Sequence, residues 1–175
     1  MLATMSQPDL RAVPTRTLST SDFTVPREDR YFEDYLPGAV YEYGYLTVTE
    51  AEILEFAARF DPQPIHTDPG FAAAGPFGGL IASGWHTAAL TMKMLTEADI
   101  DIAGGIIGAG MEELRWPVPL VPGDTIHVRV EILDSRASKS RPAIGIVRAR
   151  IQALREDGMA VQEMIASLIV PAKPA

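Results

Sequence analysis

A carboxylate and an imidazole stand five positions apart in residues 60–68, which read FDPQPIHTD. Asp61 and His66 are candidates for acid–base chemistry, because imidazole titrates near neutrality and a carboxylate can orient it or share a water molecule with it. Pro62 and Pro64 lie between them. We expect these prolines to keep the segment irregular and to aim both side chains at one point, since positions i and i+5 of a helix diverge by about 140°.

Both residues also have a structural interpretation. Asp61 follows a predicted helix, where the helix dipole disfavours negative charge, so we expect its pKa to be raised. Its side chain can instead close an Asx turn. His66 by itself is more typical of a loop or core histidine with satisfied hydrogen bonds than of a catalytic residue. The residue types alone leave these alternatives open.

Apolar periodicity predicts the elements that must position this pair. A capping box formed by Thr49 and Glu52 starts a short helix, and Pro62 ends it. A longer helix is expected over residues 83–98, with Ser83 as its N-cap. Its expected apolar stripe consists of Trp85, Ala88, Ala89, Met92 and Leu95.

Strands are expected at residues 41–48, 106–116, 125–133, 143–154 and 159–170, where β-branched residues are frequent or apolar and polar residues alternate. The order is strand, helix, loop, long helix and four consecutive strands. This order indicates an α+β protein with a mostly antiparallel sheet and its helices on one face.

Composition narrows the class of protein. The chain has 175 residues, enough for one domain with a real core, and no run long enough to cross a bilayer. We expect a flexible N-terminal tail at residues 1–28 and a single domain at 29–175. The absence of cysteine excludes disulfides and thiolate chemistry and fits the cytoplasm. The net charge of −8 argues against nucleic-acid binding, and three histidines without an H-E-x-x-H motif indicate no metal site.

The segment DPQPIH resembles the D-x-N-P-x-H core of the MaoC-like dehydratases, the (R)-specific enoyl-CoA hydratases, with Gln63 in the usual place of asparagine. TVTEAEILEFA, HTDPGFAA, FGGLIASG and LRWPVPLVPGDTI match in the same order, so the resemblance covers about residues 31–170. It implies the hot-dog fold, in which a curled antiparallel sheet wraps a long central helix. It also implies homodimers or higher homo-oligomers that pair through sheet edges.

The resemblance further implies reversible hydration of a trans-2-enoyl thioester, with CoA only as part of the substrate and no separate cofactor. Asp61 and His66 become the catalytic pair, and the backbone N–H of Gly84 becomes an oxyanion donor. A glycine in the first turn of a helix suits that role, although it also permits tight helix–sheet packing. Ser83, where many relatives have histidine, and Gln63 are expected beside the substrate. Trp85 is expected to be core or pocket wall.

Three functions remain open at this stage. The first is a hydratase, or dehydratase in reverse, acting on an acyl-CoA or acyl-carrier thioester. The second is a hot-dog thioesterase, which would release a free thiol. The third is a noncatalytic acyl-thioester-binding subunit, whose function would tolerate loss of Asp61 or His66. Residues 135–141, SRASKSR, are either a solvated hairpin tip or contacts for nucleotide phosphates.

Overall fold

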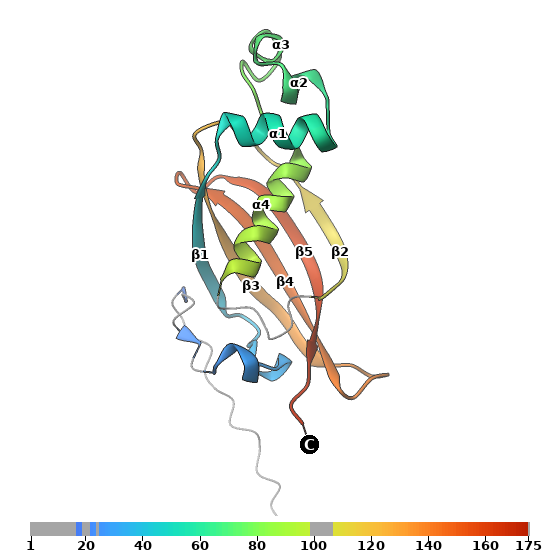
Figure 1. Ribbon diagram of the computed structural model, residues 1–175. Coiled ribbons are helices and arrows are strands. Elements are labelled where there is room, and N and C mark those ends of the chain that lie inside the picture. Colours follow the sequence, from blue (N-terminus) through green and yellow to red (C-terminus); the bar gives the residue numbers. More distant parts are fainter. Residues whose placement is uncertain (1–16, 19–21, 24, 99–106, 175) are drawn as a thin grey trace, which may run out of the picture.

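The computed structural model describes residues 17–18, 22–23, 25–98 and 107–174 (Figure 1). No helix within these ranges has the length and hydropathy needed to cross a bilayer. Two short 3₁₀ turns, η2 and η3, precede the main elements. The elements are η2 Arg27–Asp29, η3 Phe32–Asp34, β1 Val40–Thr47, α1 Glu50–Phe60, α2 Pro64–Thr67, α3 Pro69–Ala73, α4 Gly84–Glu97, β2 Ile107–Arg115, β3 Thr125–Ala137, β4 Ile144–Arg155 and β5 Ala160–Pro171.

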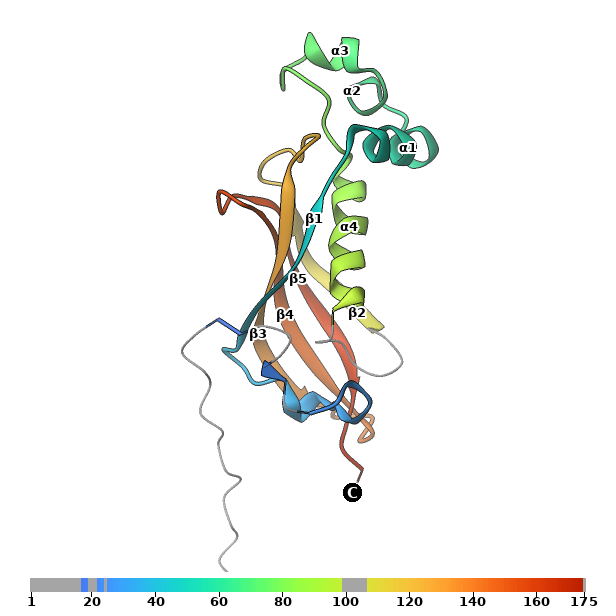
Figure 2. The ribbon, with the colours of Figure 1, turned by 60° about the vertical axis from the view of Figure 1, so that its left-hand side comes forward.

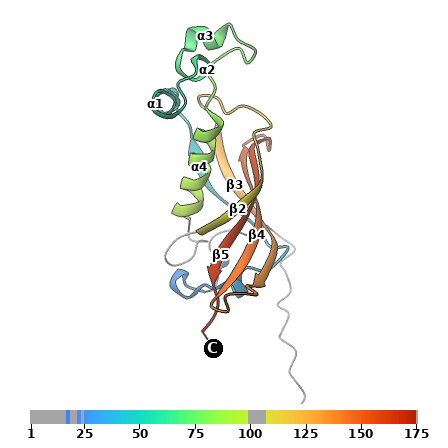
Figure 3. The ribbon, with the colours of Figure 1, turned by 90° about the vertical axis from the view of Figure 1, so that its right-hand side faces the viewer.

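The five strands form one antiparallel sheet in the order β1-β3-β4-β5-β2. Helix α4 lies against the concave face of this sheet, which curls around it (Figures 1 and 3). The α+β class and the hot-dog arrangement expected from the sequence are therefore confirmed. Helices α1, α2 and α3 lie together beyond one end of the sheet, next to the N-terminal end of α4 (Figure 2).

The long strands follow the alternation seen in the sequence. In β3 as far as Ile132, and in β4 as far as Ala153, every second residue is buried and the intervening residues are at least partly exposed. This pattern arises because successive side chains of a strand point to opposite faces of the sheet. The buried set forms the floor on which α4 packs. It consists of Ile126, Val128, Val130, Ile132, Val147, Ala149, Ile151 and Ala153.

Of the apolar stripe expected on α4, only Leu95 is buried. Trp85 is 60% exposed, and Met92 is also exposed. The buried face instead carries His86, Thr87, Leu90, Thr91, Met94 and Leu95. Thr87 and Thr91 can lie inside because each hydroxyl donates to a backbone carbonyl four residues earlier. The side of α4 that carries Trp85 and Met92 is therefore open in the single chain.

Residues 62–73 are more helical than the prolines suggested. Pro64 and Pro69 each occupy the first turn of a short helix, α2 and α3. Proline suits that position because its fixed φ fits the helix and its missing N–H would have no partner there. His66 consequently lies on α2 rather than in an irregular loop.

Most of the predicted tail at residues 1–28 lies outside the described residues. Two of its described side chains contact the domain. Leu18 is buried and its backbone pairs with Tyr41 of β1. The Phe23 ring stacks on the Tyr41 ring with centroids 5.0 Å apart. A segment ahead of residue 29 therefore packs on the sheet.

Candidate active site

Helix α1 positions Asp61, which directly follows its last residue. Its first turn is closed by the predicted capping box, in which the Glu52 N–H donates to the Thr49 hydroxyl and the Thr49 N–H donates to the Glu52 carboxylate. Ile53 and Ala57 are the buried residues of the helix. Asp61 is its C-cap residue, and its N–H donates to the Ala57 carbonyl at 2.9 Å. The backbone of Asp61 is thus fixed directly after the last helical turn.

His66 is held at one ring nitrogen by the backbone. Its Nδ1 lies 2.8 Å from the carbonyl oxygen of Ile81, and the ring is buried. A carbonyl oxygen can only accept, so Nδ1 carries the proton and the lone pair of the neutral ring is at Nε2. Nε2 lies 3.5 Å from Oδ2 of Asp61. The structure thus brings the two predicted residues together.

Two neighbouring side chains hold the Asp61 carboxylate. The Ser83 hydroxyl donates to Oδ2 at 2.6 Å, and Gln63 Nε2 donates to Oδ1 at 2.7 Å. The hydrogen bond from Ser83, followed by that from Gln63, lowers the pKa of Asp61 below its usual value. The expected rise from the helix dipole is therefore wrong, because direct donors to the ionised form outweigh it. His66, being close by, lowers the same pKa further when it is charged.

Ser83 joins the acid–base pair to the N-terminus of α4. Its hydroxyl accepts from the Trp85 N–H at 3.2 Å, which makes it the predicted N-cap, while the same oxygen donates to Asp61. Gly84, the next residue, is the first residue of the helix. N–H groups in a first helical turn lack intrahelical partners and favour a negatively charged acceptor.

Gly84 also packs tightly against Trp116. A Cβ at position 84 would come within 2.7 Å of two atoms of the indole. Nε1 of that indole donates to Oε1 of Gln162 at 3.2 Å, and the Gln162 side chain is fully buried. The packing role considered for Gly84 is therefore present. The sequence analysis did not single out Trp116 or Gln162, because only the fold brings them to the start of α4.

Of the two positions expected for Trp85, core or pocket wall, the core is wrong, because the side chain is 60% exposed. Its ring packs edge-to-face with the Trp116 ring, with centroids 5.5 Å apart. The next residue, His86, is buried, and its ring stacks on the Phe56 ring with centroids 4.6 Å apart. Burial lowers the pKa of His86, so its ring is neutral at pH 7. His86 therefore packs α1 against α4.

Residues 135–141 lie away from this site. They span the end of β3 and the turn into β4, whereas the start of β3 pairs with Thr47, close to the beginning of α1. Figure 1 shows the β3–β4 turn and the α1–α3 group at opposite ends of the sheet. Within one chain, the cations of this turn do not reach Asp61. Among the described residues, no group of three or more histidine, aspartate or glutamate side chains could hold a metal ion.

A family model for the MaoC like domain matches residues 35–151 of this chain. The chain belongs to the MaoC-like dehydratase family. It is 35% identical over 132 residues to 3-hydroxyacyl-thioester dehydratase Z of Mycobacterium tuberculosis, an alignment that covers 72% of this chain and 83% of that protein.

Solved structures agree with this MaoC-like assignment. A MaoC-like dehydratase from Rhodospirillum rubrum is 43% identical and superimposes with a TM-score of 0.79, covering 83% of this chain and 99% of that one. The R-hydratase PhaJ1 from Pseudomonas aeruginosa is 26% identical with a TM-score of 0.66, covering 82% and 86% of the two chains.

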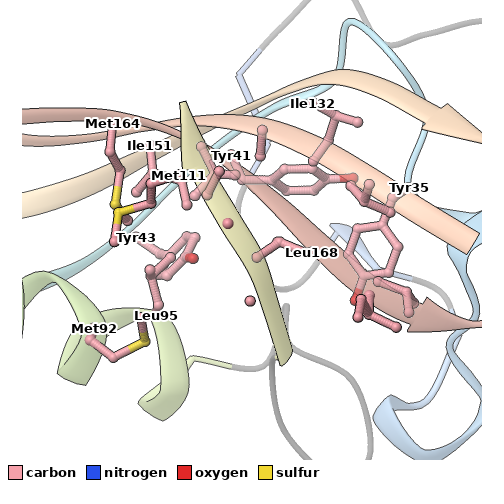
Figure 4. Close-up of a pocket in the computed structure, with 18 residues that line it drawn as sticks. Tyr35, Tyr41, Tyr43, Met92, Leu95, Met111, Ile132, Ile151, Met164 and Leu168 are labelled. Atoms are coloured by element: carbon pink, nitrogen blue, oxygen red, sulfur yellow. The ribbon is translucent and has the colours of Figure 1, made fainter. Parts of the chain in front are cut away.

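The MaoC-like domain holds an apolar cavity of about 270 Å³ between α4 and the sheet (Figure 4), which is partly open, since Met92 and Met111 among its lining residues are exposed. Met92 and Leu95 of α4 line one part, and side chains of all five strands line the rest. Asp61, His66 and Ser83 are not among its lining residues. Burial raises the pKa of the lining Tyr41 to about 12, so its hydroxyl stays neutral at any physiological pH. The cavity therefore suits an uncharged hydrocarbon group.

Replacing Ser83 with alanine in this MaoC-like protein should shift its acid–base behaviour. The main hydrogen bond that lowers the pKa of Asp61 would be lost, so that pKa should rise toward its usual value. The acid limb of the pH–rate profile should then move to higher pH. Loss of the N-cap should also lower the free energy of unfolding by about 1 kcal/mol.

The matched control is Thr49→Ala, which removes the N-cap of α1 but neither donor to Asp61. It should reduce stability by a similar amount and leave the acid limb in place. Initial rates across pH and thermal unfolding measure both effects. An acid limb that does not move in Ser83→Ala would show that Asp61 ionisation does not control the rate.

Proposed function

We propose that this protein is a hydro-lyase that adds water reversibly to a trans-2-enoyl thioester, most simply an enoyl-CoA, giving a 3-hydroxyacyl thioester. The observation that carries the proposal is the meeting of Asp61, His66 and Ser83 at the N-terminus of α4. Membership of the MaoC-like family and the likeness to a protein named R-hydratase support the same reaction.

The pair is suited to hold one water molecule. The 3.5 Å between His66 Nε2 and Asp61 Oδ2 is long for a direct hydrogen bond, and both atoms can accept. A single water has two O–H donors and can therefore bind to both. Its oxygen then keeps lone pairs directed at a substrate carbon.

The proposed reaction uses His66 as the base. Nε2 takes a proton from water as the water oxygen bonds to the β-carbon, and the electron pair of the C=C bond moves through the α-carbon toward the thioester oxygen. Asp61 suits the supporting role, because its lowered pKa keeps it ionised and able to stabilise the imidazolium. The imidazolium then returns a proton to the α-carbon, which balances the addition of one water.

The N-terminus of α4 is suited to the charge that develops on the thioester oxygen. The Gly84 N–H directly follows Ser83, whose hydroxyl binds Asp61, so the donor and the proton-transfer pair belong to one connected group. Donors placed before the reaction starts stabilise an oxyanion without reorganising. Gln63 holds the far oxygen of the carboxylate in place from the other side.

The apolar cavity is the proposed site for the acyl chain. Met92, which lines it, lies eight residues after Gly84 on the same helix, or about 12 Å along the axis. A chain whose thioester oxygen lies at Gly84 can therefore follow α4 into the space between helix and sheet. The lining offers hardly any polar surface, so an unsubstituted hydrocarbon tail is favoured.

Product analysis separates this function from its alternatives. The purified chain should convert crotonyl-CoA to 3-hydroxybutyryl-CoA without releasing free thiol, and chiral analysis should show a single enantiomer. Thiol release without a 3-hydroxyacyl product would identify a thioesterase. Binding of the thioester without turnover would identify the noncatalytic subunit.

We also propose that two copies pair through the free edge of β2. Among the described strands, β2 pairs with β5 alone, and Met111 on it is 60% exposed, as is Trp85 on the open side of α4. An exposed apolar edge strand beside an open apolar helix face is typical of a surface that a second copy covers. Asp61, His66 and Ser83 do not line the apolar cavity of the single chain, which fits a site completed by the partner.

The measured mass in solution should be at least twice the 19.0 kDa of one chain. Met111→Lys should shift the population toward the monomer, because it places a charge in the proposed interface. Met159→Lys is the matched control, since Met159 is also exposed but lies next to the β4–β5 turn. A parent protein of 19.0 kDa at micromolar concentration would refute the pairing.

A further inference from the structure

One end of the apolar cavity is closed by a residue from the N-terminal segment. Figure 4 shows Tyr35 at the end of the cavity remote from Met92, with Tyr41 and Leu168 between them. Tyr35 is 8% exposed and directly follows η3. Its ring therefore forms an end wall rather than a side wall of the space between α4 and the sheet.

Aromatic packing holds this end wall in place. The Tyr35 ring meets the edge of the Phe23 ring at 5.5 Å, and Phe23 stacks on Tyr41 at 5.0 Å. The Arg30 guanidinium covers the Phe23 ring at 4.2 Å, and its Nε donates to the carbonyl of Val25 at 2.9 Å. Such edge-to-face and cation–π contacts fix the ring orientation as well as burying area.

The segment is also anchored to the end of the sheet that lies opposite the α1–α3 group (Figure 1). The Phe32 ring fills the space over Gly145 of β4, where a Cβ would overlap it. The Phe32 carbonyl accepts from the Ser135 hydroxyl at 2.7 Å, and Asp34 forms an ion pair with Lys173 at 3.0 Å. Tyr35 is thus attached to β3, β4 and the C-terminal segment, and it cannot swing away without breaking these contacts.

Tyr35 is the first residue of the range that the family model matches, and Phe23, Arg30 and Phe32, which hold it in place, lie ahead of that range. The structure therefore points to a specificity device that depends on this chain's own N-terminal segment. We propose that Tyr35 sets the maximum length of the acyl chain that the cavity accepts. The proposal rests on the proposed function, because it takes the hydrocarbon tail of the enoyl thioester as the occupant.

The physical basis is the cost of stopping a hydrocarbon chain at a fixed wall. Each methylene that enters the cavity leaves water and gains about fourfold in kcat/KM, from about 0.8 kcal/mol per buried methylene. The first methylene that reaches Tyr35 adds nothing to kcat/KM, because the ring cannot move aside without breaking the contacts that hold it. The profile of kcat/KM against chain length should therefore rise and then stop or fall sharply.

Shortening residue 35 should move that limit. The substrates are straight-chain enoyl-CoA thioesters of increasing even length. The kcat/KM of Tyr35→Ala should continue to rise beyond the chain length at which that of the parent stops rising, and the limit for Tyr35→Leu should lie between the two. Two additional methylenes should raise kcat/KM of Tyr35→Ala about fifteenfold over the value at the parent's limit. Tyr45→Ala is the matched control, because Tyr45 on β1 is exposed and lines no part of this cavity.

A binding series makes the test independent of turnover and folding. Calorimetric titration with saturated acyl-CoA of the same lengths should show the same shift in Tyr35→Ala, in preparations whose thermal unfolding remains cooperative. If the affinities of parent and variant level off at the same chain length, or if the affinity of the parent does not depend on chain length, Tyr35 does not set the maximum length. Length-dependent binding without any hydration would instead refute the proposed function and leave the stop in place.

Discussion

Asp61→Asn is expected to lower kcat/KM for enoyl-CoA hydration by about 100-fold or more, and His66→Gln is expected to do the same. The asparagine keeps the shape of the side chain but loses the charge that faces His66 Nε2. It also has an NH₂ group in place of one carboxylate oxygen. Because an NH₂ group cannot accept a hydrogen bond, asparagine cannot keep both the bond from Ser83 and the bond from Gln63 on separate oxygens. The glutamine removes the group that exchanges the proton. The measurement is the initial rate of loss of enoyl absorbance.

The chain contains matched controls for both substitutions. Asp68 also precedes a proline and caps the short helix α3, accepting from the Phe71 N–H at 3.0 Å. Asn caps helices about as well as Asp, so Asp68→Asn should keep the parent rate. His127 lies on β3, stacked on Tyr45, and His127→Gln should behave likewise. Unchanged rates in Asp61→Asn and His66→Gln, with folding intact, would rule out acid–base catalysis by this pair.

Gly84→Ala is expected to have the second largest effect. The new methyl group would meet Trp116 at 2.7 Å, and the hydrogen bond to buried Gln162 holds the indole in place. Overpacking of this kind costs about 1–3 kcal/mol in the free energy of unfolding. The N-terminus of α4 must also move, and a misplacement of about 1 Å at a catalytic donor can cost about 100-fold in rate. Rates and thermal unfolding measure the two effects separately.

A second substitution can test the cause. Trp116→Leu removes the atoms that a Cβ at position 84 would meet, so Gly84→Ala should do less harm in that background than in the parent. Gly79→Ala is the control, because a Cβ at Gly79 has no atom within 4 Å. If Gly84→Ala were fully active and as stable as the parent, neither the packing nor the donor role of this glycine would hold.

These two predictions concern different kinds of contact. Asp61 and His66 are five positions apart, so their types and spacing made them candidates for a pair, and the motif DPQPIH indicated the catalytic role. Gly84 and Trp116 are distant in sequence, and the consequence of adding one methyl group follows only from the packed structure. The site therefore combines a motif that sequence analysis can find with a packing constraint that it cannot.

The sequence by itself determined the features that depend on near neighbours. The capping box of Thr49 and Glu52, the N-cap at Ser83 and the alternation in β3 and β4 all appear as expected. Caps and strand alternation involve residues only a few positions apart, so each local pattern determines its own outcome. The order of these elements was enough to indicate the α+β class.

Only the tertiary structure decided which groups surround the pair. Ile81 lies 15 positions after His66, and Ser83 lies 22 positions after Asp61, yet these contacts set the tautomer of the imidazole and the direction of the pKa shift. The helix dipole, which is visible from the sequence, predicts the opposite shift of this pKa. A direct hydrogen bond to a carboxylate outweighs the distant dipole, and chain spacing does not show whether that bond forms.

The open face of α4 was decided in the same way. Trp85 and Met92 are as apolar as the residues that point inward, so periodicity alone could not say which side meets the sheet. Thr87 and Thr91 lie inside because their hydroxyls bond to the helix backbone, which removes the cost of burying them. Tyr35 likewise reaches the cavity only because β3, β4 and the C-terminal segment together hold η3 against the sheet.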